Sequence, residues 1–222
     1  MRLRTRGKKA RPARKRNGEA TRERILRAAV REFAAHGFSG ARIERIVKAA
    51  KSNMKLLYEH FGDKDGLYIT VLERVYGQLR DSEALLDLET RDPAMALEAL
   101  VRFTYDHFRS NRDFVRLTSG ENLLRGKYIK ASVRIPEQSS PLIVALGGIL
   151  KRGILSGAFK KDIDALQLYI SIVALSCHHL NNRYTLSSTF RTDLASAAWL
   201  DERRSHVVEM IASFVTGTRR VP

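Results

Sequence analysis

The sequence predicts an all-α protein, and three observations lead to this fold class. From residue 21 onward, apolar residues recur at intervals of three and four, which is the period of amphipathic helices. Capping residues, glycines and prolines separate these periodic segments. The sequence shows neither an Asn-Gly β-hairpin nor a strictly alternating strand. Because 44% of the 222 residues are hydrophobic, the chain can bury the core of one large domain or of two small ones.

Three short helices are predicted in the N-terminal part. The first begins near Thr21 and ends at Gly37, since glycine readily adopts the left-handed conformation of a helix C-cap. Two shorter apolar stripes follow at 43–50 and 53–61, and Gly62 closes the second of them. Three short helices in about forty residues, with a tight connection between the last two, have the spacing of a helix-turn-helix unit.

The rest of the chain is expected to form longer helices. Asp63 is a good N-cap for the next one, which runs to about Asp81, because its carboxylate accepts hydrogen bonds from free backbone N–H groups. Prolines, asparagines and aspartates mark the later starts. The remaining helices are expected, in order, at 93–108, 111–124, 136–157, 162–184 and in a last segment that ends before Gly217.

The positive charge is unevenly distributed. Of the formal net charge of +16, residues 1–16 carry +9 without a single acidic residue, whereas 17–63 carry +3 and 64–222 carry +4. The first 16 residues also lack helical periodicity, so we expect residues 1–18 to be a flexible basic arm. Such an excess of charge indicates a polyanionic partner, with nucleic acid first and an anionic membrane surface second.

Several classes of protein are disfavoured by the sequence. The longest apolar run, 141–150, is about half as long as a membrane-spanning helix, and the basic N-terminus is not followed by an apolar signal segment. We therefore expect a cytoplasmic protein without a membrane partner. None of the common nucleotide-binding, hydrolase or metalloprotease motifs occurs, which predicts that the chain is not an enzyme and carries no cofactor. A metal or redox sensor at Cys177, beside His178 and His179, is a weaker alternative because no second cysteine is present.

The segment from Thr21 to Leu72 resembles the N-terminal DNA-binding domain of the TetR family of transcriptional regulators. The resemblance rests on the first amphipathic helix, the Gly37-Phe38 turn, Ala49-Ala50, the motif Leu57-Tyr58-x-His60-Phe61, and Lys64 followed by Leu67. It implies a homodimer with one helix-turn-helix per subunit and a helical C-terminal half that dimerises and binds an inducer. The predicted organisation is an arm at 1–18, a DNA-binding domain at 19–66 and a ligand-binding and dimerisation domain at 67–222.

Two positions depart from the family pattern. Lys51 stands where the family usually has glycine, and a left-handed non-glycine residue costs about 1 kcal/mol, so we expect a differently formed turn. Arg42 stands where Thr or Ser usually caps the second helix. Either Ser39 provides the cap or the helix begins without one, and Arg42 is then free to contact a phosphate.

The third helix is the predicted DNA reader. Leu57 and Phe61 lie four residues apart and should face the core, which leaves the start of the helix exposed. Asn53 can pair with adenine, Lys55 with guanine and Met54 with a thymine methyl group, although Met54 is equally expected to contact nothing. The family pattern assigns phosphate contacts to Ser52, Tyr58, His60 and Lys64. Tyr58 is alternatively a core aromatic residue, and His60 is alternatively a cation that complements the dipole at the helix end. The predicted DNA-binding set is Arg42, Ser52, Asn53, Met54, Lys55, Tyr58, His60 and Lys64.

The C-terminal half is similar to one ligand-sensing subclass of the family. The similarity rests on residues 114–117, 121–123, 152–159 and 162–164, and members of this subclass answer to small nitrogen-heterocyclic or aromatic metabolites. Polar groups within apolar helices are the candidate ligand contacts, but Glu121 and Asn122 are alternatively braces for a neighbouring helix and His178 an interface histidine. The predicted ligand-binding residues are Phe103, His107, Phe114, Glu121, Asn122, Tyr128, His178 and Asn181.

The last two long helices carry wide apolar stripes, and the resemblance implies that they form the dimer interface. The predicted interface residues are Leu168, Ile172, Leu175, Val207, Met210, Ile211 and Phe214. The chain is thus interpreted as a ligand-responsive regulator, most simply a repressor, whose dimer binds a palindromic double-stranded operator and is released by a small-molecule effector. The alternative is a non-specific, architectural DNA-binding protein, which would leave about 140 residues of helical domain unexplained.

Overall fold

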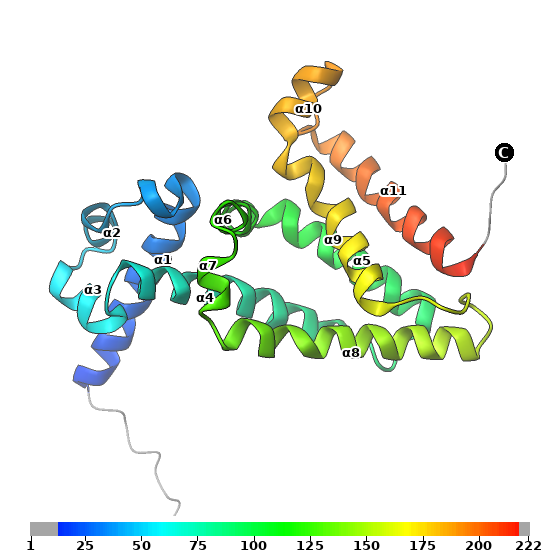
Figure 1. The fold of residues 1–222 in the computed structure, drawn as a ribbon, viewed down its shortest axis with the longest axis horizontal. Coiled ribbons are helices and arrows are strands. Elements are labelled where there is room, and N and C mark those ends of the chain that lie inside the picture. Colours follow the sequence, from blue (N-terminus) through cyan, green and yellow to red (C-terminus); the bar gives the residue numbers. More distant parts are fainter. Residues whose placement is uncertain (1–12, 218–222) are drawn as a thin grey trace, which may run out of the picture. The chain divides into compact units, whose positions relative to one another are not determined.

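The computed structural model describes residues 13–217, and all its regular elements are helices (Figure 1). This confirms the all-α prediction. The chain divides into two compact units, one up to Val71 and the other from Leu72 onward. The division lies within a single helix, α4 (Lys64–Glu83), a few residues after the predicted boundary at 66/67.

The first unit consists of α1 (Ala13–Gly40), α2 (Ile43–Ala49), α3 (Met54–Phe61) and the first turns of α4. Apolar side chains spaced at three and four along each helix meet in one core, because each helix has a single apolar face to bury. An edge-to-face contact between the rings of Phe33 and Tyr68, with centroids 4.8 Å apart, joins α1 to α4 within this core.

Helix α1 differs from its prediction at both ends. It begins at Ala13, so residues 13–18 are helical instead of belonging to the arm, and residues 1–12 lie outside the described part of the chain. Near its C-terminus, Gly37 has φ 65° and ψ 177°, a conformation open essentially to glycine alone. The regular helix therefore breaks at Gly37 as expected, and a short helical turn continues to Gly40.

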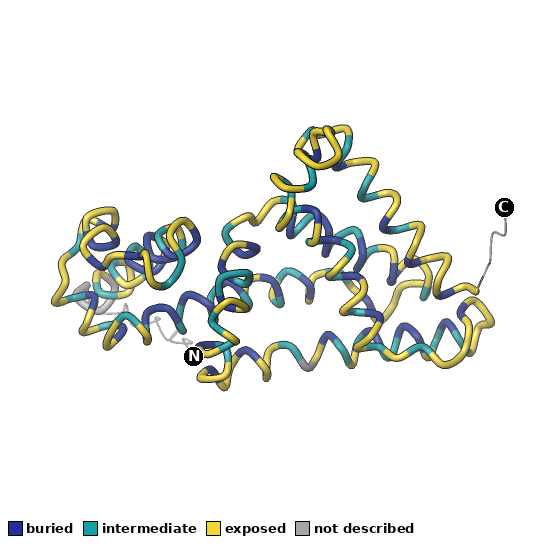
Figure 2. Tube along the Cα trace, turned by 45° about the horizontal axis from the view of Figure 1, so that its top comes forward, coloured by how far each residue is buried: buried dark blue, intermediate teal, exposed yellow. Residues whose placement is uncertain are grey.

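The second unit is built around α5 and α9. Helix α5 packs against α8, α9 and α11, and α9 also packs against α6, α8, α10 and α11. In Figure 2 the buried residues of this unit lie where these helices face one another. Its elements after α4 are η1 (Ala84–Leu86), α5 (Pro93–Ser110), α6 (Arg112–Leu123), α7 (Lys127–Lys130), α8 (Arg134–Leu155), α9 (Ala165–Asn181), α10 (Arg183–Phe190) and α11 (Ala197–Thr216).

Three of these elements were not predicted as such. The single turn α7 lacks the length that periodicity needs, and Glu121 holds it by accepting hydrogen bonds from its backbone. Helix α8 begins at Arg134, before both of the prolines that were expected to mark its start, and Pro141 lies inside it. The helix predicted at 162–184 ends at Asn181, and α10 follows as a separate helix after Asn182.

Four of the predicted dimer-interface residues are buried in the core of their own unit, and that part of the prediction is wrong. The buried stripe of α9 faces α5 and α8, and that of α11 faces α5 and α9. Burial inside the subunit produces the same helical period of apolar residues as a dimer interface would. Leu175 packs partly against this core, whereas Met210 and Phe214 are exposed by 43% and 51%. The four buried residues are Leu168, Ile172, Val207 and Ile211.

Within residues 13–217, no helix is both long and apolar enough to cross a membrane.

Candidate nucleic-acid interface and effector cavity

Helix α3 presents one face to the core and the opposite face to solvent. It starts after Asn53, whose Oδ1 accepts a hydrogen bond from the Leu56 backbone N–H at 3.0 Å. It ends at Gly62, where φ is 79°. Leu57 and Phe61 are buried as predicted, and this anchors the helix so that its outer side chains have a fixed position.

The exposed face of α3 carries three of the predicted contacts. Met54 and Tyr58 are exposed by 41% and 42%, and Lys55 is exposed between them. Since Tyr58 stands on the solvent side, it is not the core aromatic residue of the alternative interpretation. His60, in the last turn, is half-buried with its ring 6.1 Å from that of Phe61.

The structure gives Asn53 a different role from the predicted one. Its Oδ1 already accepts the capping hydrogen bond of α3, so a bidentate pair with adenine would have to share this oxygen with the cap. Sequence reasoning missed this because a residue that precedes a recognition helix is suited both to capping and to base contact. Asn53 is thus a helix cap whose amide N–H₂ group and second oxygen lone pair remain for DNA.

Two predicted phosphate contacts are not side chains that stand free at the surface. The Lys64 ammonium donates to the Ala41 carbonyl at 2.7 Å and lies 4.8 Å from the centre of the Phe38 ring. The Ser52 hydroxyl oxygen is buried and, among the described residues, has no hydrogen-bond partner. Lys64 therefore braces the domain, and the Ser52 hydroxyl does not reach the surface in this structure.

The start of α2 shows how the unusual Arg42 is accommodated. No side chain caps this helix, so the cap is not provided by Ser39. Instead, Glu32 on α1 accepts from the Arg42 backbone N–H at 3.0 Å and from Arg45 Nε at 2.6 Å. Burial alone would raise the pKa of Glu32, but these hydrogen bonds and the charge of Arg45 hold it below its usual value. The side chain of Arg42 is exposed, as a phosphate contact requires.

The turn between α2 and α3 keeps a left-handed residue without glycine. Lys51 has φ 48°, so the lysine adopts the conformation that glycine usually provides in the family. Backbone hydrogen bonds from Lys51 to Lys48 O and from Ser52 to Val47 O, at 3.2 and 2.9 Å, stabilise this turn. The expectation of a differently formed turn is therefore wrong.

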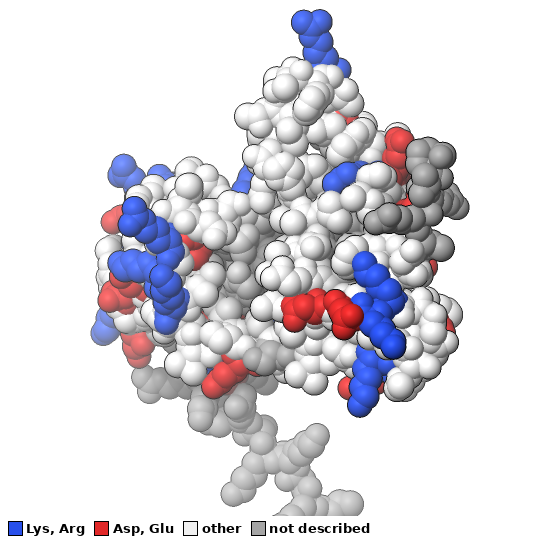
Figure 3. Space-filling model, turned by 45° about the vertical axis from the view of Figure 1, so that its right-hand side comes forward, with Lys and Arg blue, Asp and Glu red and all other residues white. Residues whose placement is uncertain are grey.

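The surface charges are mixed in sign. On the face shown in Figure 3, Lys and Arg side chains lie close to Asp and Glu side chains and do not form one large basic patch. Specific DNA recognition by such a surface depends on a few side chains of a short helix and not on a uniformly positive field.

The second unit contains a cavity of about 290 Å³, here called the effector cavity. Its aromatic walls include Tyr76 and Phe114, whose rings meet edge to face at 5.3 Å, and Phe108 stacks on Phe114 at 5.7 Å. Its full lining is Tyr76, Leu79, Arg80, Phe108, Phe114, Val115, Thr118, Ser119, Asn122, Tyr169, Val173, Cys177 and Asn181.

Hydrogen-bonding groups are placed around this aromatic cavity. Arg80 donates to the Tyr169 hydroxyl at 3.0 Å, and Ser119 donates to Asn181 Oδ1 at 2.9 Å. Burial raises the pKa values of the Tyr76 and Tyr169 hydroxyls, so both stay neutral near pH 7. An uncharged hydroxyl both donates and accepts, which suits a small ligand that carries polar groups on an apolar frame.

Three of the eight predicted ligand-binding residues line this cavity: Phe114, Asn122 and Asn181. Glu121 is only 1% exposed and accepts from the backbone N–H groups of Tyr128 and Ile129 at 2.6 and 3.1 Å. It therefore braces α7, as the alternative interpretation held, and Tyr128 is buried with that turn.

The other predicted ligand contacts also lie outside the lining of the effector cavity. His107 packs behind its wall, between the rings of Phe103 and Phe114, and burial lowers its pKa. His178 is exposed and has its ring nitrogen 3.3 Å from Asn182. Cys177 does line the cavity, but burial raises the pKa of its thiol, which disfavours a reactive sensor.

Sequence reasoning missed two cavity residues on α4. Tyr76 and Arg80 are four residues apart and flank the apolar stripe of Val75 and Leu79. A polar pair at this spacing beside a core stripe was the available signal, since residues four apart lie on one helix face. Periodicity alone does not show that this polar pair faces a cavity, because the cavity forms only where α4 meets α5, α6 and α9.

Comparison with known proteins gives matches to both units. The family described as "Bacterial regulatory proteins, tetR family" matches residues 25–71, and the family described as "Tetracyclin repressor-like, C-terminal domain" matches residues 93–211. The HTH-type transcriptional repressor NicS of Pseudomonas putida is 38% identical over 186 residues, covering 82% of this chain and 88% of NicS. The HTH-type transcriptional repressor SCO4008 of Streptomyces coelicolor is 30% identical over 164 residues, covering 72% and 79%.

Solved structures show the same fold. A TetR transcriptional regulator from Chloroflexus aurantiacus has a TM-score of 0.68 at 18% identity, covering 90% of this chain and 98% of that one. The regulator FadR from Bacillus subtilis, crystallised with stearoyl-CoA, has a TM-score of 0.66 at 20% identity, covering 87% and 98%. Together with the two family matches, these likenesses show that the chain belongs to the TetR family of helix-turn-helix transcriptional regulators.

Proposed function

We propose that the protein is a ligand-responsive repressor whose dimer binds a palindromic operator through α3 and is released by a small-molecule effector. The observation that carries this proposal is the two-sided geometry of α3. Leu57 and Phe61 fix the helix from inside, while Lys55 and Tyr58 stand free on its outer face. A helix held in this way can enter a major groove and place side chains on base edges and phosphates.

The proposed contacts differ in kind. Lys55 donates to guanine in the groove and specifies sequence, whereas Tyr58 and Arg42 contact phosphates and set the register. Met54 packs on a thymine methyl group or a sugar. His60 is retained as a weaker phosphate contact, since its side chain is only partly exposed.

The effector is proposed to be a small planar molecule with polar substituents. Aromatic rings form much of the effector cavity, and its volume of about 290 Å³ is close to the lower end of the range for small-ligand sites. Tyr76, Leu79 and Arg80 belong to α4, so the lining includes the helix that is separated from α3 by only two residues. A shift of α4 on ligand binding would change the distance between the two readers of a dimer. Such coupling is typically worth about 1–3 kcal/mol, or roughly five- to 150-fold in operator affinity.

Operator binding by single variants tests the DNA-binding part of this proposal. The DNA for this test is the fragment upstream of the gene that the protein protects in a footprinting experiment. Fluorescence anisotropy should show that Lys55→Ala relaxes the base preference at one base pair and weakens binding to the best site by about 1–3 kcal/mol. Tyr58→Ala should weaken binding to all sequences about equally. The exposed Lys48→Ala on α2 is the matched control and should change neither affinity nor preference.

The same measurement separates the proposal from its alternative. A regulator should bind its palindrome at least about 1,000-fold more tightly than unrelated DNA at physiological salt. An architectural protein would show little difference between the two DNAs. If Lys55→Ala kept the base preference of the wild type, Lys55 would not contact a base directly, and this part of the proposal would be wrong.

A further inference from the structure

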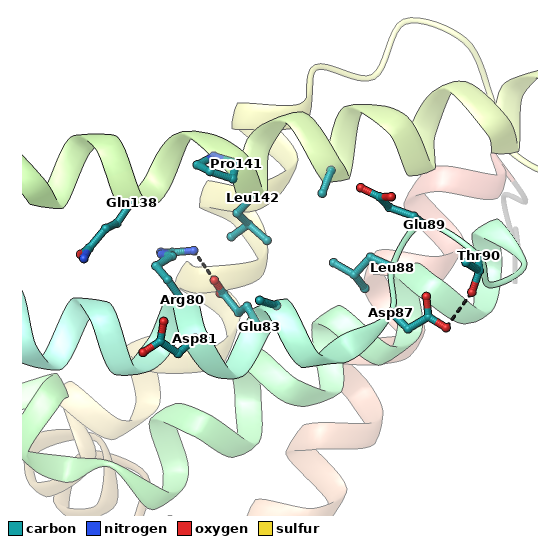
Figure 4. Close-up of a pocket in the computed structure, with 12 residues that line it drawn as sticks. Arg80, Asp81, Glu83, Asp87, Leu88, Glu89, Thr90, Gln138, Pro141 and Leu142 are labelled. Carbon is teal, nitrogen blue, oxygen red and sulfur yellow. Dashed lines mark hydrogen bonds and ion pairs between the residues drawn. The ribbon is translucent and has the colours of Figure 1, made fainter. Parts of the chain in front are cut away.

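The second unit contains another cavity, larger than the effector cavity and different in chemistry. It has a volume of about 520 Å³ and lies between the end of α4, the segment after it, and α8 (Figure 4). We call it the acidic cavity. Its lining consists of Arg80, Asp81, Glu83, Ala84, Asp87, Leu88, Glu89, Thr90, Gln138, Pro141, Leu142 and Ala145.

The charge of this lining opposes that of the whole chain. Four carboxylates and a single guanidinium give it an excess of negative charge, although the chain has a formal charge of +16. Between the charged groups, the walls are apolar. Figure 4 shows Leu142 of α8 and Leu88 pointing into the space, with the Arg80–Glu83 ion pair on one side of it and the carboxylate of Glu89 turned toward α8.

Glu83 is a buried polar group of the cavity whose hydrogen bonding is incomplete, as is that of Arg80, whose Nε is buried without a partner among the described residues. Glu83 is only 4% exposed and uses Oε2 for an ion pair with Arg80 Nη1. Its other carboxylate oxygen, Oε1, is buried and has no hydrogen-bond partner among the described residues. A buried acceptor left in this state costs about 1–3 kcal/mol, more when charged, so an N–H donor in the cavity would gain this hydrogen bond.

The Arg80 charge compensates Glu83 only in part. Burial raises the pKa of Glu83 to about 7, and the attraction of Arg80 opposes this rise without cancelling it. Arg80 is also shared, since its Nη2 donates to Tyr169 at 3.0 Å in the effector cavity. A second cation near Glu83 would therefore stabilise a carboxylate whose cationic partner, Arg80, is shared between two sites.

From this arrangement we propose that the acidic cavity is a second ligand site, specific for an organic monocation that has an N–H donor at one end of an apolar body. The ammonium or amidinium group binds Glu83 Oε1, which a rotation of the buried Glu83 carboxylate brings to the cavity wall, and the apolar body packs on Leu88, Leu142 and Pro141. Asp81 and Glu89 add attraction from the cavity rim. The proposal concerns a site other than the effector cavity and does not depend on operator binding.

The chemistry of the lining selects this class over others. An anion would meet four carboxylates, and a neutral apolar molecule would leave Glu83 Oε1 without a partner. A bare metal ion would leave the apolar walls and most of the 520 Å³ unused. An organic cation uses both parts of the lining.

Calorimetric titration of the full-length protein without DNA tests the site. The probe is 4-phenylbutylammonium, and 4-phenylbutanol is its uncharged control of nearly the same size. We expect the ammonium to bind at least tenfold more tightly than the alcohol. Equal affinity of the two, or no binding of the ammonium, would overturn the proposal, whereas operator binding would be unaffected by that outcome.

Variants locate the bound cation. Glu83→Gln, which keeps the shape of the side chain, should weaken ammonium binding at least tenfold, and Glu89→Gln should weaken it by less. Glu202→Gln, which removes an exposed carboxylate on α11 outside this cavity, is the matched control and should bind like the wild type.

A steric variant covers the case in which Glu83→Gln does not fold. Ala145→Phe fills the cavity from α8 without changing a charge and should abolish binding of the ammonium. If this variant, shown to be folded by its circular dichroism, binds the ammonium with wild-type affinity, the cation lies elsewhere and the proposal is wrong.

Discussion

At the scale of single residues, burial changes the pKa of several side chains in this protein, and His179 is a clear case. It is 4% exposed, its ring stacks on Tyr105 at 5.4 Å, and Trp199 lies 5.3 Å away. Its Nε2 is 3.3 Å from the Tyr105 hydroxyl. Burial, followed by the charge of Arg203, lowers the pKa of His179 to about 4.

This shift predicts a loss of stability in acid. The pKa of His179 in the unfolded chain is about 6.5, so the stability that neutral His179 provides is present above pH 6.5 and is lost as pH falls toward 4. Between pH 7 and pH 5, the loss should be about 2 kcal/mol. Glu83, with its pKa raised to about 7, changes stability in the opposite direction over this range, so wild type alone does not isolate the histidine.

Urea unfolding of wild type and His179→Phe at pH 7, 6 and 5 isolates the contribution of His179 to the pH dependence of stability. The difference in free energy of unfolding between wild type and variant should shrink by about 2 kcal/mol from pH 7 to pH 5, because phenylalanine has no proton to gain. His206→Gln, at an exposed position on α11, is the matched control for the loss of a histidine. A constant difference between wild type and His179→Phe would show that burial does not shift this titration.

At the scale of elements, the connection between α3 and α4 leaves no space for a side chain at Gly66. Gly66 donates to the Asp63 carboxylate at 2.7 Å, and a Cβ added to it would lie 2.3 Å from the Phe61 carbonyl oxygen. Gly66→Ala should therefore force the backbone apart and lower the free energy of unfolding by about 1–3 kcal/mol, measured by urea denaturation.

Gly77→Ala in the same helix is the matched control. Its added Cβ would meet the Gln138 side chain at 3.6 Å, an ordinary contact. Here alanine should raise stability by roughly 0.5–1 kcal/mol through its higher helix propensity. Equal effects at the two positions would show that the close approach at Gly66 is relieved at no cost.

The elements also show what a sequence can predict. The buried pair Leu57 and Phe61 and the cap at Asp63 follow from periodicity and local hydrogen bonding, both of which are encoded within a few residues. The Glu32 hydrogen bonds that start α2 were not predictable, because they depend on two helices meeting. The effector cavity was only partly predictable for the same reason, since its lining comes from α4, α5, α6 and α9.

At the scale of the whole molecule, the proposed dimer requires a surface that the subunit leaves uncovered. Helices α9 and α11 each bury one stripe in their own core, and each leaves an exposed apolar pair spaced at four residues. These pairs are Leu166 with Ile170 and Met210 with Phe214, exposed by 43–53%. Apolar side chains that recur on two neighbouring helices favour a contact with a second copy.

Ile170→Asp tests this surface and its link to DNA binding. A charge buried at an apolar interface is strongly unfavourable, so the variant should sediment as a monomer at concentrations at which wild type is dimeric. Operator affinity should fall by more than about tenfold, because one subunit presents only one reader to a two-part site. Val144→Asp, at an apolar residue of α8 that is 75% exposed, is the matched control and should remain dimeric. A dimeric Ile170→Asp with normal operator affinity would place the subunit contact on another face.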